Sequence, residues 1–81
     1  MLQIKILGPG CANCKRLEQM THRQVEKLGL TADIEKVTDY GQIMAYGVMS
    51  TPGLVVNGEV VSYGRIPTEQ EVANWLTGTQ N

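Results

Sequence analysis

Two cysteines, Cys11 and Cys14, stand three residues apart and are the only cysteines in the 81-residue chain. At the start of a helix this spacing brings both side chains to one side, with α-carbons about 5 to 6 Å apart, within reach of a disulfide. The pair can therefore open and close without refolding of the chain. Disulfide-stabilised secreted proteins instead spread four or more cysteines along their length. We interpret the pair as a reactive site, with thiol-disulfide exchange as its first candidate chemistry.

The two cysteines differ in their expected surroundings. Cys11 stands at the first helical turn, where unpaired backbone N–H groups and the helix dipole stabilise a thiolate, and Lys15 one turn later acts in the same direction. Cys14 falls on the apolar side of the helix, where burial disfavours a thiolate. We expect Cys11 to attack a substrate disulfide and Cys14 to displace the reduced product. Gly8 and Gly10 leave the rim of the site without side chains, so a substrate backbone can approach.

Metal binding is the alternative interpretation of the same spacing. C-x-x-C is half of a zinc site and the whole of a linear copper(I) site. Zinc needs two further ligands, and the one histidine, His22, stands two turns beyond Cys14 on the polar side of the helix. We interpret His22 as a surface residue and expect no resident metal and no cofactor. A copper carrier, whose usual element order is βαββαβ, stays open as the alternative function.

The first half of the chain predicts two parallel strands joined by a helix. Leu2 to Leu7 is a short apolar run that stops at Gly-Pro-Gly, which is typical of a buried strand that enters a loop. From Ala12 to Leu28 apolar residues recur every three or four positions, which predicts an amphipathic helix that ends at Gly29. Thr31 to Val37 is the second strand, and the helical crossover makes it parallel to the first.

The second half predicts a short helix, a hairpin and a last helix. Thr38 or Asp39 can cap the short helix. Asn57-Gly58 is the strongest two-residue signal for a tight hairpin, because both positions favour positive φ. A capping box from Thr68 to Glu71 begins the last helix. The expected order is βαβαββα, with the short helix ending at Gly47 and the hairpin strands over residues 54–56 and 59–62.

A second motif, Val48-Met49-Ser50-Thr51-Pro52-Gly53-Leu54, lies between the short helix and the hairpin. With the C-x-x-C pair and the βαβαββα order, it resembles the thioredoxin superfamily, in which a proline after Thr or Val, just before the third strand, is cis and packs beside the active disulfide. The size, the Gly-x-Gly-Cys-x-x-Cys-Lys opening and the late Tyr63-Gly64-Arg65 are similar to small prokaryotic thioredoxin-like and glutaredoxin-like redox-active disulfide proteins.

The resemblance implies a minimal thioredoxin fold, an α/β arrangement in which three helices flank a four-stranded mixed sheet, as one domain over residues 1–81. It implies a thiol-disulfide oxidoreductase that reduces protein disulfides and receives electrons from a reductase or a low-molecular-weight thiol. Thr51 then pairs its backbone with the substrate chain as a short strand would. Gly10, Thr51, a cis Pro52 and Tyr63 are the expected substrate-binding residues.

The sequence also departs from ordinary thioredoxin. Gly10 replaces the tryptophan before the first cysteine, and residues 1–10 contain no Asp or Glu that could serve as the buried acid. Lys5 stands near that place, and Glu35 on the second strand, a weak candidate for the acid's role, is interpreted as solvated. Glutathione binding through Arg65 stays open, as do the reduction potential and the physiological target.

Composition narrows the classes of partner. The formal net charge is −1 and the Lys and Arg residues are scattered, which excludes the basic patch that nucleic-acid binding requires. No apolar stretch approaches the roughly 20 residues that span a bilayer, and the first five residues lack the features of a secretion signal. We expect a cytoplasmic monomer.

Overall fold

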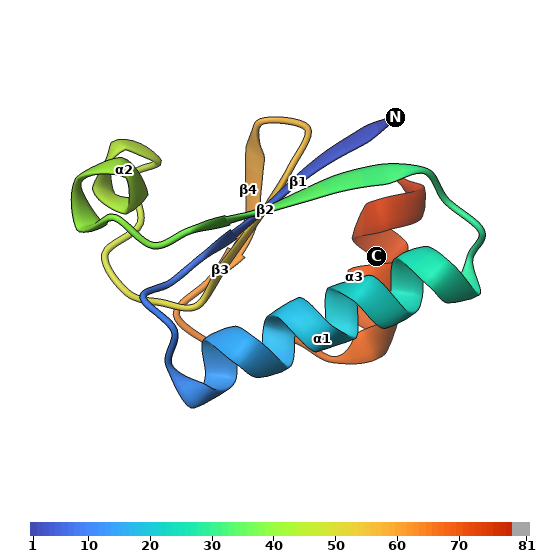
Figure 1. Ribbon diagram of the computed structural model, residues 1–81, viewed down its shortest axis with the longest axis horizontal. Helices are drawn as coiled ribbons and strands as arrows, with labels where there is room; N and C mark the ends of the chain where they lie inside the picture. Colours follow the sequence, from blue (N-terminus) through green and yellow to red (C-terminus); the bar gives the residue numbers. More distant parts are fainter. Residues whose placement is uncertain (79–81) are drawn as a thin grey trace.

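The computed structural model describes residues 1–78, so the last three residues of the expected 1–81 unit lie outside the described residues. The described chain forms a four-stranded mixed sheet with three helices, in the expected order βαβαββα, and Figure 1 shows how these elements are arranged. The elements are β1 (Leu2–Leu7), α1 (Ala12–Lys27), β2 (Ala32–Val37), α2 (Tyr40–Ala45), β3 (Gly53–Val56), β4 (Glu59–Tyr63) and α3 (Glu69–Thr77). The minimal thioredoxin fold is confirmed.

The sheet has the strand order β2-β1-β3-β4. β1 pairs with β2 in parallel, as the helical crossover predicts, and with β3 in the antiparallel sense, while β4 is antiparallel to β3. The carboxyl end of β1 therefore lies beside the start of β3, where Leu7 pairs with Gly53, and the end of β4 follows, where Gly53 pairs with Tyr63. These strand ends form one end of the sheet, and the loops that leave it carry the cysteine pair and the Thr51-Pro52 motif.

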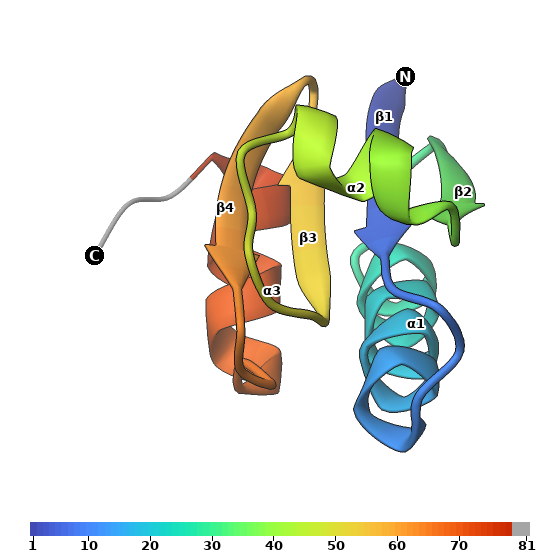
Figure 2. The same ribbon diagram turned by 90° about the vertical axis from the view of Figure 1, so that its left-hand side faces the viewer.

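The helices divide between the two faces of the sheet. α1 and α3 lie on one face and α2 lies on the other (Figure 2). Alternation along β1 sends Ile4 and Ile6 into the core under α1 and α3, whereas Leu7 packs on the opposite face with residues of α2 and β2. An ion pair between Arg23 of α1 and Glu69 of α3, with Nε and Oε1 2.9 Å apart, also joins the two neighbouring helices.

The apolar side of α1 differs from the expected one at its carboxyl end. Leu28, the last apolar residue of the predicted helix, is 38% exposed and is the C-cap residue, and Gln24 is buried. The physical reason is the change of direction after Lys27, where Gly29 takes a φ of +67° and leads the chain toward β2. Leu30, one residue later, packs against the core instead.

The hairpin forms as the Asn-Gly signal predicts. Asn57 and Gly58 have φ values of 51° and 83°, the positive values that a two-residue turn between twisted strands requires. Asn57 also joins the turn to β1: its Oδ1 accepts a hydrogen bond from the Gln3 N–H, and its own N–H donates to the Gln3 carbonyl. The turn residue thus sets both the hairpin and its register against β1.

The start of α3 is the predicted capping box, and Arg65 adds to it. The Thr68 hydroxyl accepts a hydrogen bond from the Glu71 N–H, and the Glu71 carboxylate accepts one from the Thr68 N–H. Both terminal guanidinium nitrogens of Arg65 also donate to this carboxylate, at 3.0 and 2.9 Å. The Arg65 hydrogen bonds, followed by that of the Thr68 backbone, lower the pKa of Glu71 from 4.5 to about 2.

This lowered pKa predicts an acid-sensitive contribution to stability. The ionised carboxylate stabilises the folded state above about pH 4.5, and this contribution is lost as the pH falls from 4.5 toward 2. In chemical unfolding, Glu71→Gln is expected to be less stable than the wild type at neutral pH, with the difference closing over that window. Glu59→Gln, which changes an exposed glutamate on β4, is the matched control. A constant difference between Glu71→Gln and the wild type across the window would contradict this account.

Candidate active site

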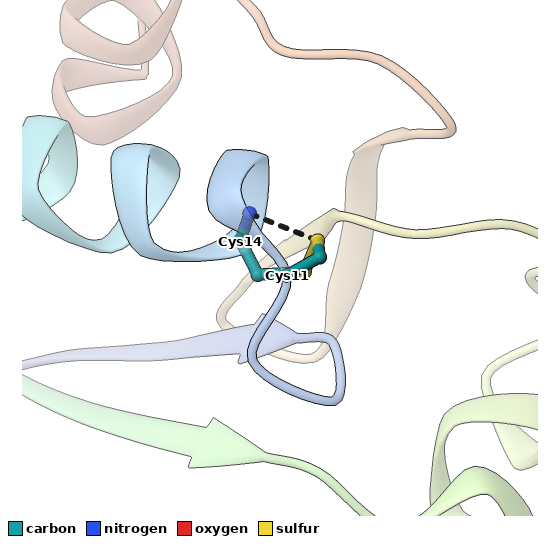
Figure 3. Close-up of a disulfide and its surroundings, with 2 residues drawn as sticks. All are labelled: Cys11 and Cys14. Carbon is teal, nitrogen blue, oxygen red and sulfur yellow. Dashed lines mark hydrogen bonds between the residues drawn. A yellow bond between two sulfur atoms is a disulfide. The ribbon is translucent and has the colours of Figure 1, made fainter.

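Cys11 and Cys14 form a disulfide at the start of α1 (Figure 3), with their α-carbons 5.0 Å apart. Cys11 is the N-cap residue of the helix, and its Sγ accepts a hydrogen bond from the Cys14 N–H at 3.1 Å. The side chain of Cys11 is exposed, whereas Cys14 is only 4% exposed. The structure thus places one sulfur at the surface and the other in the core, as the helical pattern predicts.

This arrangement favours negative charge on the outer sulfur. Backbone N–H groups in the first turn of a helix have no partner within the helix, and the dipole of the 16-residue α1 adds positive potential there. The N–H of Cys14 donates to Cys11 Sγ, and a hydrogen bond of this kind stabilises a thiolate at that atom. Lys15, one turn along the helix, is exposed. Its expected effect on the Cys11 thiolate stays a prediction.

Gly8 has a different role from the one that its position before the cysteines indicates. We expected Gly8 to leave the rim open for a substrate, but the residue is buried against the inner sulfur. A Cβ at Gly8 would overlap with Cys14 Sγ and would lie 3.1 Å from Cys14 Cβ and 3.7 Å from Thr51 Cβ. The missing side chain therefore makes room for Cys14. Gly10, in contrast, is exposed, and a Cβ there would meet nothing within 4 Å, and its part in substrate binding stays a prediction.

The Thr51-Pro52 peptide bond is cis, as the resemblance implies. Thr51 is half-buried and lies near the cysteines, since a Cβ on Gly8 would touch both Thr51 and Cys14. The carbonyl of Pro52 accepts a hydrogen bond from the Gly64 N–H at 2.9 Å, which ties the loop to the residue after β4. Tyr63 precedes that glycine and is 54% exposed. The fold therefore brings the cysteines, the Thr51-Pro52 loop and Tyr63 to the same end of the sheet.

A shallow depression of about 210 Å³ adjoins this loop, between α2 and the segment that leads to Thr51. Three of its side chains are large, apolar or aromatic and strongly exposed: Tyr40, Met44 and Met49, the last at 92%. Met44 and Met49 were not among the predicted site residues. The sequence signal for this surface is the set of apolar residues on the short helix and just before the Thr-Pro motif. A helix of six residues is too short for such residues to form a reliable periodic pattern.

Lys5 and Glu35 lie away from the inner sulfur. Lys5 Nζ is 3.9 Å from Glu35 Oε1 and 6.0 Å from the centre of the Tyr46 ring, on the face that carries α2. The Tyr46 hydroxyl, and then the Glu35 carboxylate, raise the pKa of Lys5. Glu35 is 61% exposed, in agreement with its interpretation as a solvated residue. Arg65, the candidate for binding a glutathione carboxylate, forms an ion pair with Glu71.

A small cavity of about 70 Å³ lies against Cys14 instead. Its charged lining residues are Lys15 and Glu18 from α1 and Lys36 from β2, and Ile6, Gly8, Gly10 and Thr38 complete it. The Glu18 carboxylate is 3.9 Å from Lys36 Nζ and 3.9 Å from His22 Nε2. Glu18 was not among the predicted site residues, although its spacing of four from Cys14 places the two side chains one turn apart on neighbouring positions of the helix.

Within residues 1–78, no three side chains of His, Cys, Asp or Glu gather as they would around a metal ion. His22 lies on the exposed side of α1 beside Glu18, in agreement with its interpretation as a surface residue. Among the described helices, none combines the length and the apolar character needed to cross a membrane.

Comparison with known proteins agrees with this geometry. A family model described as a thioredoxin domain matches residues 2–77. A thioredoxin from Methanothermobacter thermautotrophicus is 39% identical over 77 residues, which cover 95% of this chain and all of that protein. A thioredoxin from Methanocaldococcus jannaschii is 38% identical over 76 residues, which cover 94% of this chain and 87% of the relative.

Proposed function

The chain belongs to the thioredoxin family and is a thiol-disulfide oxidoreductase, and on this premise we propose that it reduces disulfides in proteins. One observation carries the proposal: Cys11 is exposed at the N-cap of α1 and its Sγ accepts a hydrogen bond from the Cys14 N–H, while Cys14 is buried. Reduction through a mixed disulfide requires two parts: an outer sulfur that is stabilised as a thiolate, and an inner sulfur that is kept from solvent.

In the proposed reaction the Cys11 thiolate attacks one sulfur of a substrate disulfide. A bond forms between Cys11 Sγ and that sulfur, and the other substrate sulfur leaves as a thiolate that takes up a proton. Cys14 then loses its proton and attacks Cys11 Sγ, so the second substrate sulfur leaves and the Cys11–Cys14 disulfide forms. Two electrons pass from the protein dithiol to the substrate. A reductase or a low-molecular-weight thiol supplies the two electrons that restore the reduced protein, and no cofactor takes part in this scheme.

The surroundings of Cys11 support an extended polypeptide as the substrate. We propose that the backbone of Thr51 pairs with the substrate chain and that Gly10, Pro52 and Tyr63 border its path. Main-chain pairing makes few demands on sequence, which suits a reductase of several proteins. The depression beside Thr51 offers Tyr40, Met44 and Met49 to apolar substrate side chains, and flexible methionines adapt to side chains of different shape.

The test is reduction of insulin by the protein in the presence of dithiothreitol, followed by the turbidity of the released B chain. The wild type is expected to accelerate the reaction strongly over dithiothreitol alone. A variant with both Cys11→Ser and Cys14→Ser is the control and is expected to add nothing. Titration of the reduced protein with copper(I) against a chromophoric chelator examines the carrier function. Tight copper uptake together with no acceleration of insulin reduction would overturn the proposal.

A further inference from the structure

The second step of the proposed reaction needs a group that removes the proton of Cys14. Cys14 is buried, and burial away from water disfavours the thiolate that must attack the mixed disulfide. The strand that leads into the cysteines carries no carboxylate, and Glu35 lies on the other face of the sheet beside Lys5. We propose that Glu18 is the proton acceptor for Cys14, an inference that rests on the proposed function.

Glu18 lies beside Cys14 on α1. Glu18 follows Cys14 by four residues on α1, so the two side chains are neighbours on the same side of the helix. Both line the same cavity, and no other carboxylate is among its lining residues. The cavity measures about 70 Å³, which is enough for a water molecule to pass the proton from sulfur to carboxylate.

Glu18 also has basic side chains as neighbours. Lys36 extends from β2 to within 3.9 Å of the carboxylate, and His22 approaches it to 3.9 Å from the next turn of α1. Lys15 lines the cavity from the same helix, and β1 contributes only the uncharged Ile6. Lys36 from β2 and His22 from α1 thus flank the carboxylate beside the cavity. The side chain is 26% exposed, so a proton that it accepts can pass on to solvent.

The proton balance of the step is simple. The Cys14 S–H proton moves to the Glu18 carboxylate, and the Cys14 sulfur forms a bond to Cys11 Sγ. The bond between Cys11 and the substrate sulfur breaks, and the substrate leaves as a thiolate that takes up a proton from Glu18 or from water. The same carboxyl group can return a proton to Cys14 when an external dithiol reduces the disulfide.

The experiment separates the two steps in time. Reduced protein in excess is mixed by stopped flow with dithiobis(nitrobenzoate), an aromatic disulfide that yields one coloured thiolate when Cys11 attacks and a second when Cys14 resolves the mixed disulfide. The rate of the second phase is measured from about pH 5 to pH 9. For Glu18→Gln we expect this phase to be at least about tenfold slower near pH 6 and to rise about tenfold per pH unit, because only hydroxide remains as a base.

Two further variants make the result specific. Glu18→Asp keeps a carboxylate, so this variant and the wild type are both expected to show a shallower pH dependence than Glu18→Gln, with Glu18→Asp slower than the wild type. Glu26→Gln, an exposed glutamate two turns further along α1, is expected to match the wild type. The first phase is expected to change little in all three variants, because it depends on Cys11.

Two outcomes would overturn the role of Glu18. In the first, the rate of the second phase of Glu18→Gln depends on pH as it does in the wild type. In the second, that phase becomes faster than in the wild type, because loss of the negative charge makes the Cys14 thiol a stronger acid. Failure of the proposed function gives a different result, in which the wild type itself shows no second phase and does not reduce insulin.

Discussion

Cys11→Ser is expected to lower the rate of insulin reduction by on the order of 10³-fold or more, to the rate of dithiothreitol alone. Cys11 Sγ is the exposed sulfur of the pair and the atom that accepts the Cys14 N–H at the start of α1. A serine hydroxyl keeps the cap of the helix, since serine is among the best N-cap residues, but it is not ionised and does not attack a disulfide. The variant should therefore fold normally and lose only the chemistry.

The matched control is Asn13→Ala, a change at an exposed residue between the two cysteines. This variant is expected to retain most of the insulin-reducing activity. Thermal unfolding of Cys11→Ser and of wild-type protein in its reduced form shows whether the fold is intact. Substantial activity in Cys11→Ser would assign the attack to another group and contradict the account.

Gly8→Ala is expected to destabilise the reduced protein by about 1 to 3 kcal/mol, the usual cost of an extra methyl group in a well-packed core. Gly8 is buried at the end of β1, and its N–H donates to the Val37 carbonyl at 2.9 Å, so its backbone cannot retreat easily. The added Cβ would overlap with Cys14 Sγ. A displaced Cys14 also resolves mixed disulfides more slowly, so the rate of insulin reduction should fall with the stability.

A double-mutant cycle isolates this contact. Gly8→Ala is introduced into the wild type and into Cys14→Ala, and urea unfolding is measured under reducing conditions, so that the disulfide does not enter the comparison. Without the sulfur, the larger part of the cost should disappear, and the remainder reflects the Cβ of residue 14, which lies 3.1 Å from the added atom. An equal cost in both backgrounds would show that Gly8 acts through something other than Cys14.

Much of the fold was predictable because its signals are local. Thr68 and Glu71 form a capping box, Asn57-Gly58 forms the hairpin turn, and the spacing of Cys11 and Cys14 places one sulfur outside and one inside. Each of these rests on contacts within about four residues of the chain, where residue type decides geometry.

The rest depended on contacts between distant segments. Gly8 was interpreted as open rim because nothing in the sequence shows that the end of β1 packs on a sulfur of α1. Glu18 was overlooked because its position becomes informative only when β2 brings Lys36 to the same cavity. Met49 is exposed beside Thr51 through the path of the loop after α2, which follows no regular pattern.

The unequal positions of the two sulfurs connect the fold with the proposed chemistry. The helix start holds Cys11 at the surface with an N–H pointing at its sulfur, and the absence of a side chain at Gly8 gives Cys14 its buried place. Attack and resolution are thus assigned to different atoms by packing. These two roles are tested most directly by measuring which cysteine holds a substrate when the other is removed.

That measurement is the intact mass of each single-cysteine variant after incubation with insulin. Cys14→Ser retains the attacking Cys11 and cannot resolve, so it is expected to accumulate a covalent adduct with an insulin chain that dithiothreitol releases. Cys11→Ser, whose remaining sulfur is buried, is expected to form little or none. An adduct on Cys11→Ser but not on Cys14→Ser, or no adduct on either variant, would contradict the assignment of Cys11 as the nucleophile.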